Sequence, residues 1–198
     1  VVLISDMSAL VVVQQISSGA DTMVLLALPF FLLAGEIMNA AGITKRLTRF
    51  ALALIGPLPG GLSYVVVIAN MLVAMVSGAA IASAAAVGST MVPMMEQKGY
   101  PKGFAAAVNA SSATIGPVIP PSVGFIIYAS VSGASVGKLF LAGTLPGILI
   151  ALVIMAVCTV VAWRARHPKG ERHSAREMLH SFWAALPGLL MPVIILGG

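Results

Sequence analysis

Charge and cysteine are scarce in this sequence. Charged residues make up 9% of the 198 residues, and cysteine occurs once. Soluble domains carry about 25% charged residues, so a water-soluble fold of this length would lack the charge to cover its surface. The single cysteine, Cys158, excludes a disulfide framework, and its place in a long apolar run indicates a buried packing residue.

Known catalytic motifs are also absent. The sequence has no HExxH, no Walker phosphate loop and no G-x-S-x-G, so nothing supports intramembrane proteolysis or ATP hydrolysis. His167, His173 and His180 lie in or beside a basic segment without metal-ligand spacing, and we interpret them as solvated. We therefore predict a protein that is not an enzyme, with no catalytic residue and no cofactor.

Neither end of the sequence has the features of a natural terminus. No basic leader or small-residue cleavage site lies near Val1. The apolar segment that starts at Leu186 stops at Gly198 before it could span a bilayer. We therefore expect the sequence to be a piece of a longer chain.

Long apolar runs dominate what is present. Apolar residues make up 59% of the chain, its mean hydropathy is +1.04, and residues 139–163 contain no charge. A run of about 18 apolar residues is enough for a membrane-spanning helix. The 20 glycines and 12 prolines lie partly inside these runs, which indicates close helix packing and interrupted helices. We predict an all-α integral membrane protein in a lipid bilayer.

The cations form three short clusters and not a basic face. The clusters are Lys45/Arg46/Arg49, Lys98/Lys102 and Arg164/Arg166/Lys169/Arg172/Arg176. Short basic loops between apolar segments indicate membrane topology, and they do not indicate nucleic-acid binding. With all three clusters on the cytoplasmic side, Lys138 is left outside.

We predict one membrane domain over residues 1–198. Residues 1–16 form a helix and residues 17–21 a break, and a spanning helix covers residues 22–41. The following segments are an interfacial arm helix and linker (43–60), a helical hairpin (62–97), a broken helix (103–132), a spanning helix (137–163), and a cytoplasmic loop with an interfacial helix (164–185).

We predict the hairpin and the broken helix because the helices in these two stretches are too short to span a bilayer. The hairpin turns at Ser77-Gly78, and residues 115–121 contain three prolines and a glycine. Two separate spans over 103–132 would put the last basic cluster on the opposite side, so one broken helix is favoured. Both interruptions are then near the membrane midplane, where free carbonyl groups suit sodium and helix N-termini suit an anion.

Polar side chains accompany these interruptions. Asn109, Ser111, Ser112 and Thr114 lead into the break, and we predict that they bind a polar substrate. Ser83 and Ser89, on the second hairpin arm, are better explained by hydrogen bonds to their own helix. Glu36 is an acid in an apolar helix, which leaves two readings open: a functional site, or a partner of Lys45 or Arg46.

Several motifs resemble the large membrane subunit of TRAP (tripartite ATP-independent periplasmic) transporters. They are residues 29–39 (PFFLLAGEIMN), 77–78 (SG), 88–89 (GS), 99–100 (GY), 111–122 (SSATIGPVIPPS), 139–143 (LFLAG) and 145–147 (LPG). The motifs occur in order from about residue 22 to the end. The chain resembles the first of two inverted halves of such a subunit.

The resemblance implies an elevator-type, multi-pass importer of the bacterial or archaeal inner membrane, driven by sodium. A periplasmic binding protein would deliver a carboxylate of the C4-dicarboxylate, keto acid or sialic acid type, and a small four-helix membrane subunit would support the large one. Sodium, the coupling ion, would be held by backbone oxygens near Ser77, Gly116, Ile119 and Pro121, with Ser111, Ser112 and Thr114 near the substrate.

One position departs from the family pattern. Ala79 follows Gly78 where many relatives have a serine, so a hydroxyl contact at the hairpin tip is in doubt.

Two alternatives to this function stay open. They are another hairpin-type transporter, for citrate or inorganic anions, and a scaffold subunit that does not transport.

Overall fold

The computed structural model describes residues 11, 13–14, 23–56, 58–165, 167 and 174–197. The helix predicted for residues 1–16 and the break at 17–21 therefore lie almost wholly outside the described residues, as does most of the basic segment 166–173. Within the described ranges, the regular elements are all α-helices, as predicted. One of them, α8, is long and apolar enough to cross a membrane by length and composition.

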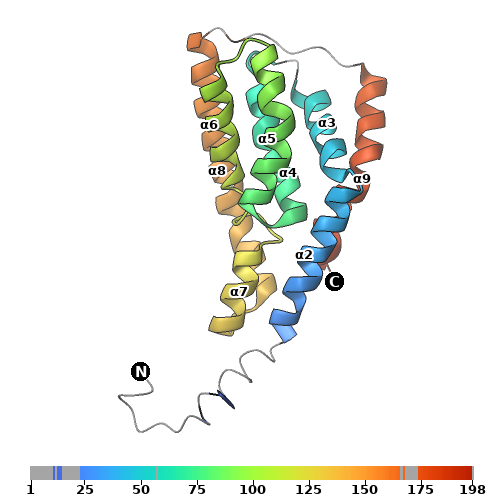
Figure 1. Ribbon diagram of the computed structural model, residues 1–198, viewed down its shortest axis with the longest axis vertical. Coiled ribbons are helices and arrows are strands. Elements are labelled where there is room, and N and C mark those ends of the chain that lie inside the picture. The colour runs from blue at the N-terminus through green and yellow to red at the C-terminus, as the bar shows by residue number, and fades with distance from the viewer. Residues whose placement is uncertain are drawn as a thin grey trace.

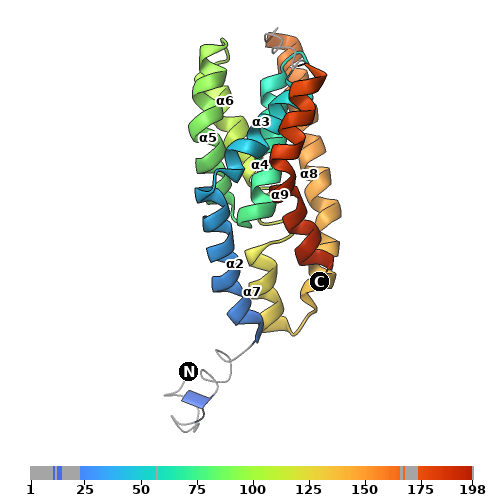
Figure 2. The same ribbon diagram turned by 90° about the vertical axis from the view of Figure 1, so that its right-hand side faces the viewer.

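The helices run roughly along one long axis (Figures 1 and 2). Their bounds are α2 Met23–Ala40, α3 Ile43–Ile55, α4 Gly61–Ser77, α5 Ala80–Gln97, α6 Lys102–Ala113, α7 Val123–Ser132, α8 Val136–Ala165 and α9 Ala175–Gly197.

Two interruptions lie partway along the bundle. Helices α4 and α5 are joined by a sharp turn at Gly78 and Ala79, and α6 and α7 are joined by a series of turns over residues 114–122. Figure 1 shows both interruptions at about the same height beside α8. At about 1.5 Å per residue, α6 and α7 are about 18 and 15 Å long, whereas α8 is about 45 Å long. Together α6 and α7 therefore extend along the length that α8 covers alone.

The core is centred on α4. This helix contacts α2, α3, α5, α6, α8 and α9. Val65, Val66, Val67 and Ala69 are fully buried although they point in different directions around the helix. A helix that is apolar all round is a central helix. The first arm of the α4–α5 pair is therefore enclosed by the rest of the chain.

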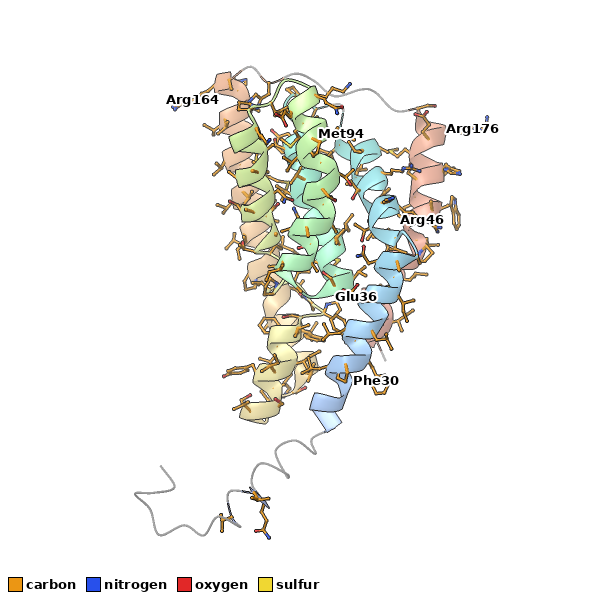
Figure 3. The ribbon with its side chains drawn as sticks, viewed as in Figure 1. Phe30, Glu36, Arg46, Met94, Arg164 and Arg176 are labelled. Carbon is orange, nitrogen blue, oxygen red and sulfur yellow. The ribbon has the colours of Figure 1, made fainter. Side chains whose placement is uncertain are left out.

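Helix α3 runs along the length of the bundle and does not lie across the end of the bundle. Thr44, Leu47, Thr48 and Ala51 are buried, and the helix packs against α4 and α9. Figure 3 shows Arg46 nearer the middle of the bundle than Arg164 and Arg176. That all three basic clusters lie on the cytoplasmic side stays a prediction, and the apolar face of α3 is covered by protein. Its position relative to a bilayer stays a prediction.

Helix α9 is longer than predicted. The expected interfacial helix ending at residue 185 is the first half of a continuous helix that ends at Gly197. Gly188 lies within this helix, where a Cβ atom would lie 2.6 Å from Cγ2 of Ile43 on α3. The glycine is a close-packing position within the helix and not a break.

His167 is not the solvated residue that was predicted. It is half-buried, and its ring centroid lies 4.5 Å from that of Tyr100 and 5.0 Å from that of Phe104. Burial also lowers the pKa of its imidazole, because water no longer stabilises the charged form. His167 thus packs the end of α8 against the loop between α5 and α6.

Candidate ion and substrate site

The tip of the α4–α5 pair lies against the break between α6 and α7. Gly78 has φ +61°, and a Cβ atom there would lie 3.1 Å from the carbonyl oxygen of Pro121. A Cβ atom on Gly116 would lie 3.3 Å from the backbone nitrogen of Ala80 and 3.3 Å from Cβ of Ala74. The two interruptions are therefore in direct contact, and glycine provides the space at both.

Helix α2 covers the tip from another side. A Cβ atom on Gly35 would lie 3.1 Å from the carbonyl oxygen of Val76 and 3.6 Å from Cα of Ser77, and the Phe31 ring lies beside Gly78. Phe31 and Gly35 are four residues apart and share one helix face. Three segments that are distant in sequence therefore meet at the tip.

Among the described residues, the break contains several buried residues whose carbonyl groups accept no hydrogen bond. The carbonyl of Ile115 accepts bonds from the amides of Val118 (3.0 Å) and Ile119 (2.9 Å). In contrast, the carbonyl oxygens of Gly116, Ile119 and Pro121 accept no hydrogen bond from any described residue, although these residues are buried. Unsatisfied carbonyl groups cost several kcal/mol each in an apolar environment, whereas they are good ligands for a hard cation such as sodium.

Of the four residues predicted to hold sodium, three thus have an available carbonyl oxygen. The fourth, Ser77, is half-buried at the tip, next to Gly78. Within the described part of the chain, its hydroxyl makes two long contacts, both with Ala79, of 3.4 and 3.5 Å. The structure therefore brings Ser77 and Pro121 to neighbouring positions through Gly78, and it brings Gly116 to the start of α5.

Glu36 lines a small cavity beside the tip. The cavity has a volume of about 110 Å³ and is lined by Glu36, Asn39, Thr44 and Ser77 among others. The hydroxyl of Thr44 donates a hydrogen bond of 2.9 Å to Oδ1 of Asn39. Among the described residues, no ion pair joins Glu36 to Lys45 or Arg46, so the structure gives no support to the pairing considered above.

The four predicted substrate residues separate into two pairs. Ser111 and Thr114 are exposed, and the Thr114 hydroxyl donates a bond of 2.7 Å to the Ser111 carbonyl. Asn109 and Ser112 are buried. Nδ2 of Asn109 donates to the Ala84 carbonyl (2.9 Å), and the Ser112 hydroxyl donates to the Val108 carbonyl (2.7 Å). Ser111 and Thr114 are thus available to a ligand, whereas Asn109 and Ser112 are engaged within the fold.

Asn70 is a residue that the sequence reasoning missed. It is fully buried in α4, and its Nδ2 donates to Oδ1 of Asn109 (3.0 Å) and to the hydroxyl of Ser112 (2.8 Å). Through Asn109 the same network reaches Ala84 on α5. A buried amide within an otherwise apolar helix was the available signal. The network joins α4, α5 and α6, so it supports the first half of the broken helix.

The serines of the second arm bond to their own helix. The hydroxyl of Ser83 donates to the Ala80 carbonyl (3.0 Å), and that of Ser89 donates to the Ala86 carbonyl (3.1 Å). These bonds are the local ones that serine commonly makes in apolar helices.

The chain is similar in sequence to a known protein family over its whole length. The family model of the DctM component of tripartite ATP-independent periplasmic transporters matches residues 1–198. The chain is 45% identical over 188 residues to a 2,3-diketo-L-gulonate TRAP transporter large permease protein of Escherichia coli, covering 95% of this chain and 44% of the relative. It is 47% identical over 174 residues to a C4-dicarboxylate TRAP transporter large permease protein of Pseudomonas aeruginosa, covering 88% and 41%.

A third relative has a different substrate in its name. The chain is 40% identical over 185 residues to a sialic acid TRAP transporter large permease protein of Vibrio cholerae, covering 93% of this chain and 43% of the relative. The chain thus spans less than half the length of each of these three relatives.

Proposed function

Because the chain belongs to the family of the DctM component of tripartite ATP-independent periplasmic transporters, we propose that it forms the first half of a sodium-coupled carboxylate permease. In this proposal α4 and α5 form a re-entrant hairpin and α6 and α7 a broken spanning helix. The hairpin and the broken helix belong to the moving part of an elevator-type transporter in a bacterial inner membrane.

The observation that carries the proposal is the set of buried carbonyl oxygens at the break. Gly116, Ile119 and Pro121 present these oxygens where the tip of the α4–α5 pair meets the break. A cation there offsets the cost of removing the carbonyl groups from water. The exposed hydroxyls of Ser111 and Thr114 lie just before the same break and are the groups we assign to the substrate.

The relatives support our proposal for the substrate class, and the family supports our proposal for the partners. Their names specify 2,3-diketo-L-gulonate, C4-dicarboxylates and sialic acid, each of which carries a carboxylate. We propose a substrate of this class, delivered by a periplasmic binding protein, and a small four-helix membrane subunit as the second membrane component.

Uptake into proteoliposomes tests the proposal. The whole permease is reconstituted with its small subunit and binding protein, and uptake of radiolabelled carboxylates is followed under an inward sodium gradient. We expect accumulation that disappears when potassium replaces sodium. Accumulation that is indifferent to sodium would contradict the coupling, and no accumulation of any carboxylate would favour a scaffold role.

Topology gives a separate prediction. We expect Lys98→Cys, in the loop between α5 and α6, to be shielded from an impermeant external maleimide, and Lys138→Cys, near the start of α8, to be labelled. The reason is that basic loops stay cytoplasmic, and the proposed broken helix of α6 and α7 lies between the two positions. Both variants are made in a permease without other cysteines. Labelling of Lys98→Cys from outside intact cells would contradict the proposed orientation.

Alanine substitutions of the neighbouring residues Ser111 and Ser112 should have different effects. Ser111→Ala removes an exposed hydroxyl, so we expect a rise in the KM for substrate of about tenfold, as for one lost hydrogen bond, with an unchanged thermal unfolding midpoint. Ser112→Ala removes a buried hydroxyl that bonds Asn70 and Val108, so we expect a lower unfolding midpoint. Uptake kinetics and thermal unfolding are measured on both. The reverse pattern would exclude Ser111 as a substrate contact.

A further inference from the structure

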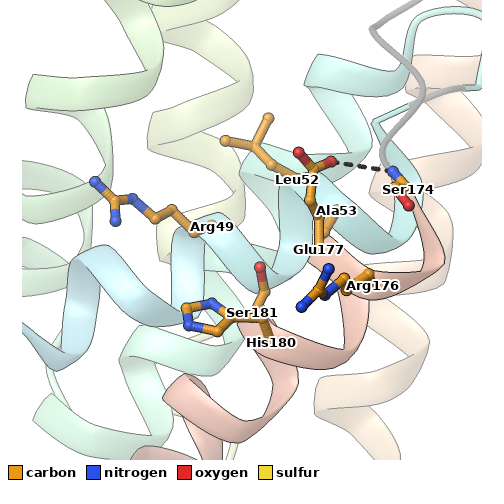
Figure 4. A pocket seen from close by; sticks show the side chains of 8 residues that line it. All are labelled: Arg49, Leu52, Ala53, Ser174, Arg176, Glu177, His180 and Ser181. Carbon is orange, nitrogen blue, oxygen red and sulfur yellow. Dashed lines mark hydrogen bonds between the residues drawn. The ribbon is translucent and has the colours of Figure 1, made fainter.

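Two of the cavities outside the break differ in how their charged groups are arranged. The cavity between α3 and α9 has a volume of about 710 Å³ and is lined by Arg49, Arg176 and Glu177 among others. Figure 4 shows the Arg49 side chain extended away from Arg176, and the Glu177 carboxylate accepts a hydrogen bond of 3.0 Å from the amide of Ser174. The two arginines therefore do not converge on one point.

The cavity beside the tip of the α4–α5 pair is smaller and has an acid in its lining. Glu36 and Asn39 come from α2, where residues three apart share a helix face, and Thr44 comes from α3. The volume of about 110 Å³ is that of about three water molecules, at about 30 Å³ each. Sites for small organic ligands start at about 300 Å³. The cavity can therefore hold an ion with a little water, but not a carboxylate substrate.

The described part of the chain supplies no positive partner for Glu36. Among the described residues, no ion pair and no hydrogen bond is found for its carboxylate, and the exposed Lys45 and Arg46 are not part of the cavity lining. Figure 3 shows Glu36 beside the end of the α4–α5 pair. In the function proposed above this end lies near the membrane midplane, where an ionised carboxylate is costly unless a positive charge lies beside it. A cation in the cavity would supply that charge.

The neighbouring amide is positioned to act as a second ligand. The buried Thr44 donates a hydrogen bond of 2.9 Å from its hydroxyl to Oδ1 of Asn39. An amide oxygen has two lone pairs, so Oδ1 keeps one for a cation. Carboxylate and carbonyl oxygens suit hard cations, whereas a proton would need the carboxylate alone. Glu36 and Asn39 are exposed in this chain, so an ion can enter the cavity on the side of α2.

We propose that the cavity beside the tip binds a sodium ion that is distinct from the ion at the break. The Glu36 carboxylate and Oδ1 of Asn39 are its protein ligands, and water fills the remaining ligand positions. Thr44 is a positioning residue that acts through Asn39. The inference rests on the proposed function, because the membrane depth of Glu36 comes from the proposed hairpin.

Counting bound sodium ions tests this proposal without a measurement of transport. Equilibrium binding of radioactive sodium to the purified whole permease gives the number of bound ions and their affinity. Glu36→Gln removes the charge and keeps the shape, so we expect about one bound sodium ion fewer. Ala82→Val keeps the ligands and takes up space in the cavity lining, so we expect about tenfold weaker binding of the same ion. The controls are Glu96→Gln and Ala85→Val, the same changes at exposed positions of α5 outside the cavity.

The result supports the proposal if both test variants show these losses, both controls bind sodium like the unmodified permease, and all unfold at the same temperature without sodium. An unchanged number of ions in Glu36→Gln would overturn it, whether the affinity is unchanged or lower, because the carboxylate would then not hold an ion of its own. An equal loss in Glu96→Gln would show a general effect of charge and would overturn it as well. Unchanged binding in Ala82→Val would place the ion outside the cavity and also overturn it.

The same measurement separates this inference from the proposed function. If the unmodified permease binds no sodium at all, the proposed sodium coupling and the second ion both fail. If it binds sodium, and Gly116→Val loses an ion while Glu36→Gln does not, the site at the break stands and the inference about the cavity fails alone.

Discussion

Replacing Gly116 by valine should nearly abolish sodium-driven uptake. A Cβ atom at this position would lie 3.1 Å from the Ala113 carbonyl oxygen and 3.3 Å from the Ala80 nitrogen, and valine adds two further methyl groups. The backbone must then shift, and the carbonyl oxygens of the break move with it. We expect the apparent sodium affinity to fall by about 100-fold, which corresponds to about 2.8 kcal/mol. The measurement is the sodium dependence of initial uptake rates in proteoliposomes.

Two controls accompany this variant. Gly103→Val adds the same side chain to α6 where nothing lies within 4 Å, so uptake should stay close to that of the unmodified permease. Ser77→Ala keeps the backbone carbonyl at the tip and should have a much smaller effect than Gly116→Val. If Ser77→Ala abolished sodium dependence while Gly116→Val preserved it, the ion would be held by side chains elsewhere.

Replacing Asn70 by leucine should destabilise the packing of α6 against α4. The substitution removes the donor that bonds Asn109 and Ser112, and both acceptors stay buried. A buried polar group left without its partner costs about 1–3 kcal/mol. We therefore expect the thermal unfolding midpoint to fall by about 5 °C, on the scale of 2–4 °C per kcal/mol for domains of this size. Thermal unfolding of the purified permease in detergent is the measurement.

A double-mutant cycle distinguishes the network from a local packing effect. Asn70→Leu/Asn109→Leu should cost less than the sum of the two single substitutions, because each single change already removes the hydrogen bond that the two amides share. Ser89→Ala is the control, since its hydroxyl is exposed and bonds only within α5. Additive effects of the two asparagine substitutions would show that the bond between them contributes nothing to stability.

The composition and the proline pattern were enough to predict the helical elements. The charge-free run over residues 139–163 predicted α8, and Pro117, Pro120 and Pro121 predicted the end of α6 and the turns that follow it. These features depend on local chemistry, because a chain without charges favours a bilayer and a proline cannot continue a helix. Predicting α8 and the end of α6 therefore did not require knowledge of contacts between residues that are distant in sequence.

Other features depended on tertiary contacts that the pattern does not specify. The amphipathic pattern of α3 fits a membrane interface and a protein neighbour equally well, and the neighbour proved to be α4 with α9. The interfacial helix predicted to end at residue 185 continues to Gly197, and Gly188 is where α9 approaches Ile43. At the site, Asn109 and Ser112 have the residue types expected for substrate contacts, but Asn70, 39 residues before Asn109, engages both.

The short lengths of α6 and α7 have a consequence for how the chain enters the membrane during synthesis. At 12 and 10 residues, neither helix alone reaches across the hydrocarbon layer of about 30 Å. Each would expose the carbonyl groups of the break to lipid unless the α4–α5 pair and α8 were already beside it. Helix α8 is synthesised after both, so if α6 and α7 form one broken span as proposed, we expect the insertion machinery to retain residues 102–132 until α8 has emerged. Under this proposal, integration of this part of the protein is a joint event of several helices and not a stepwise one.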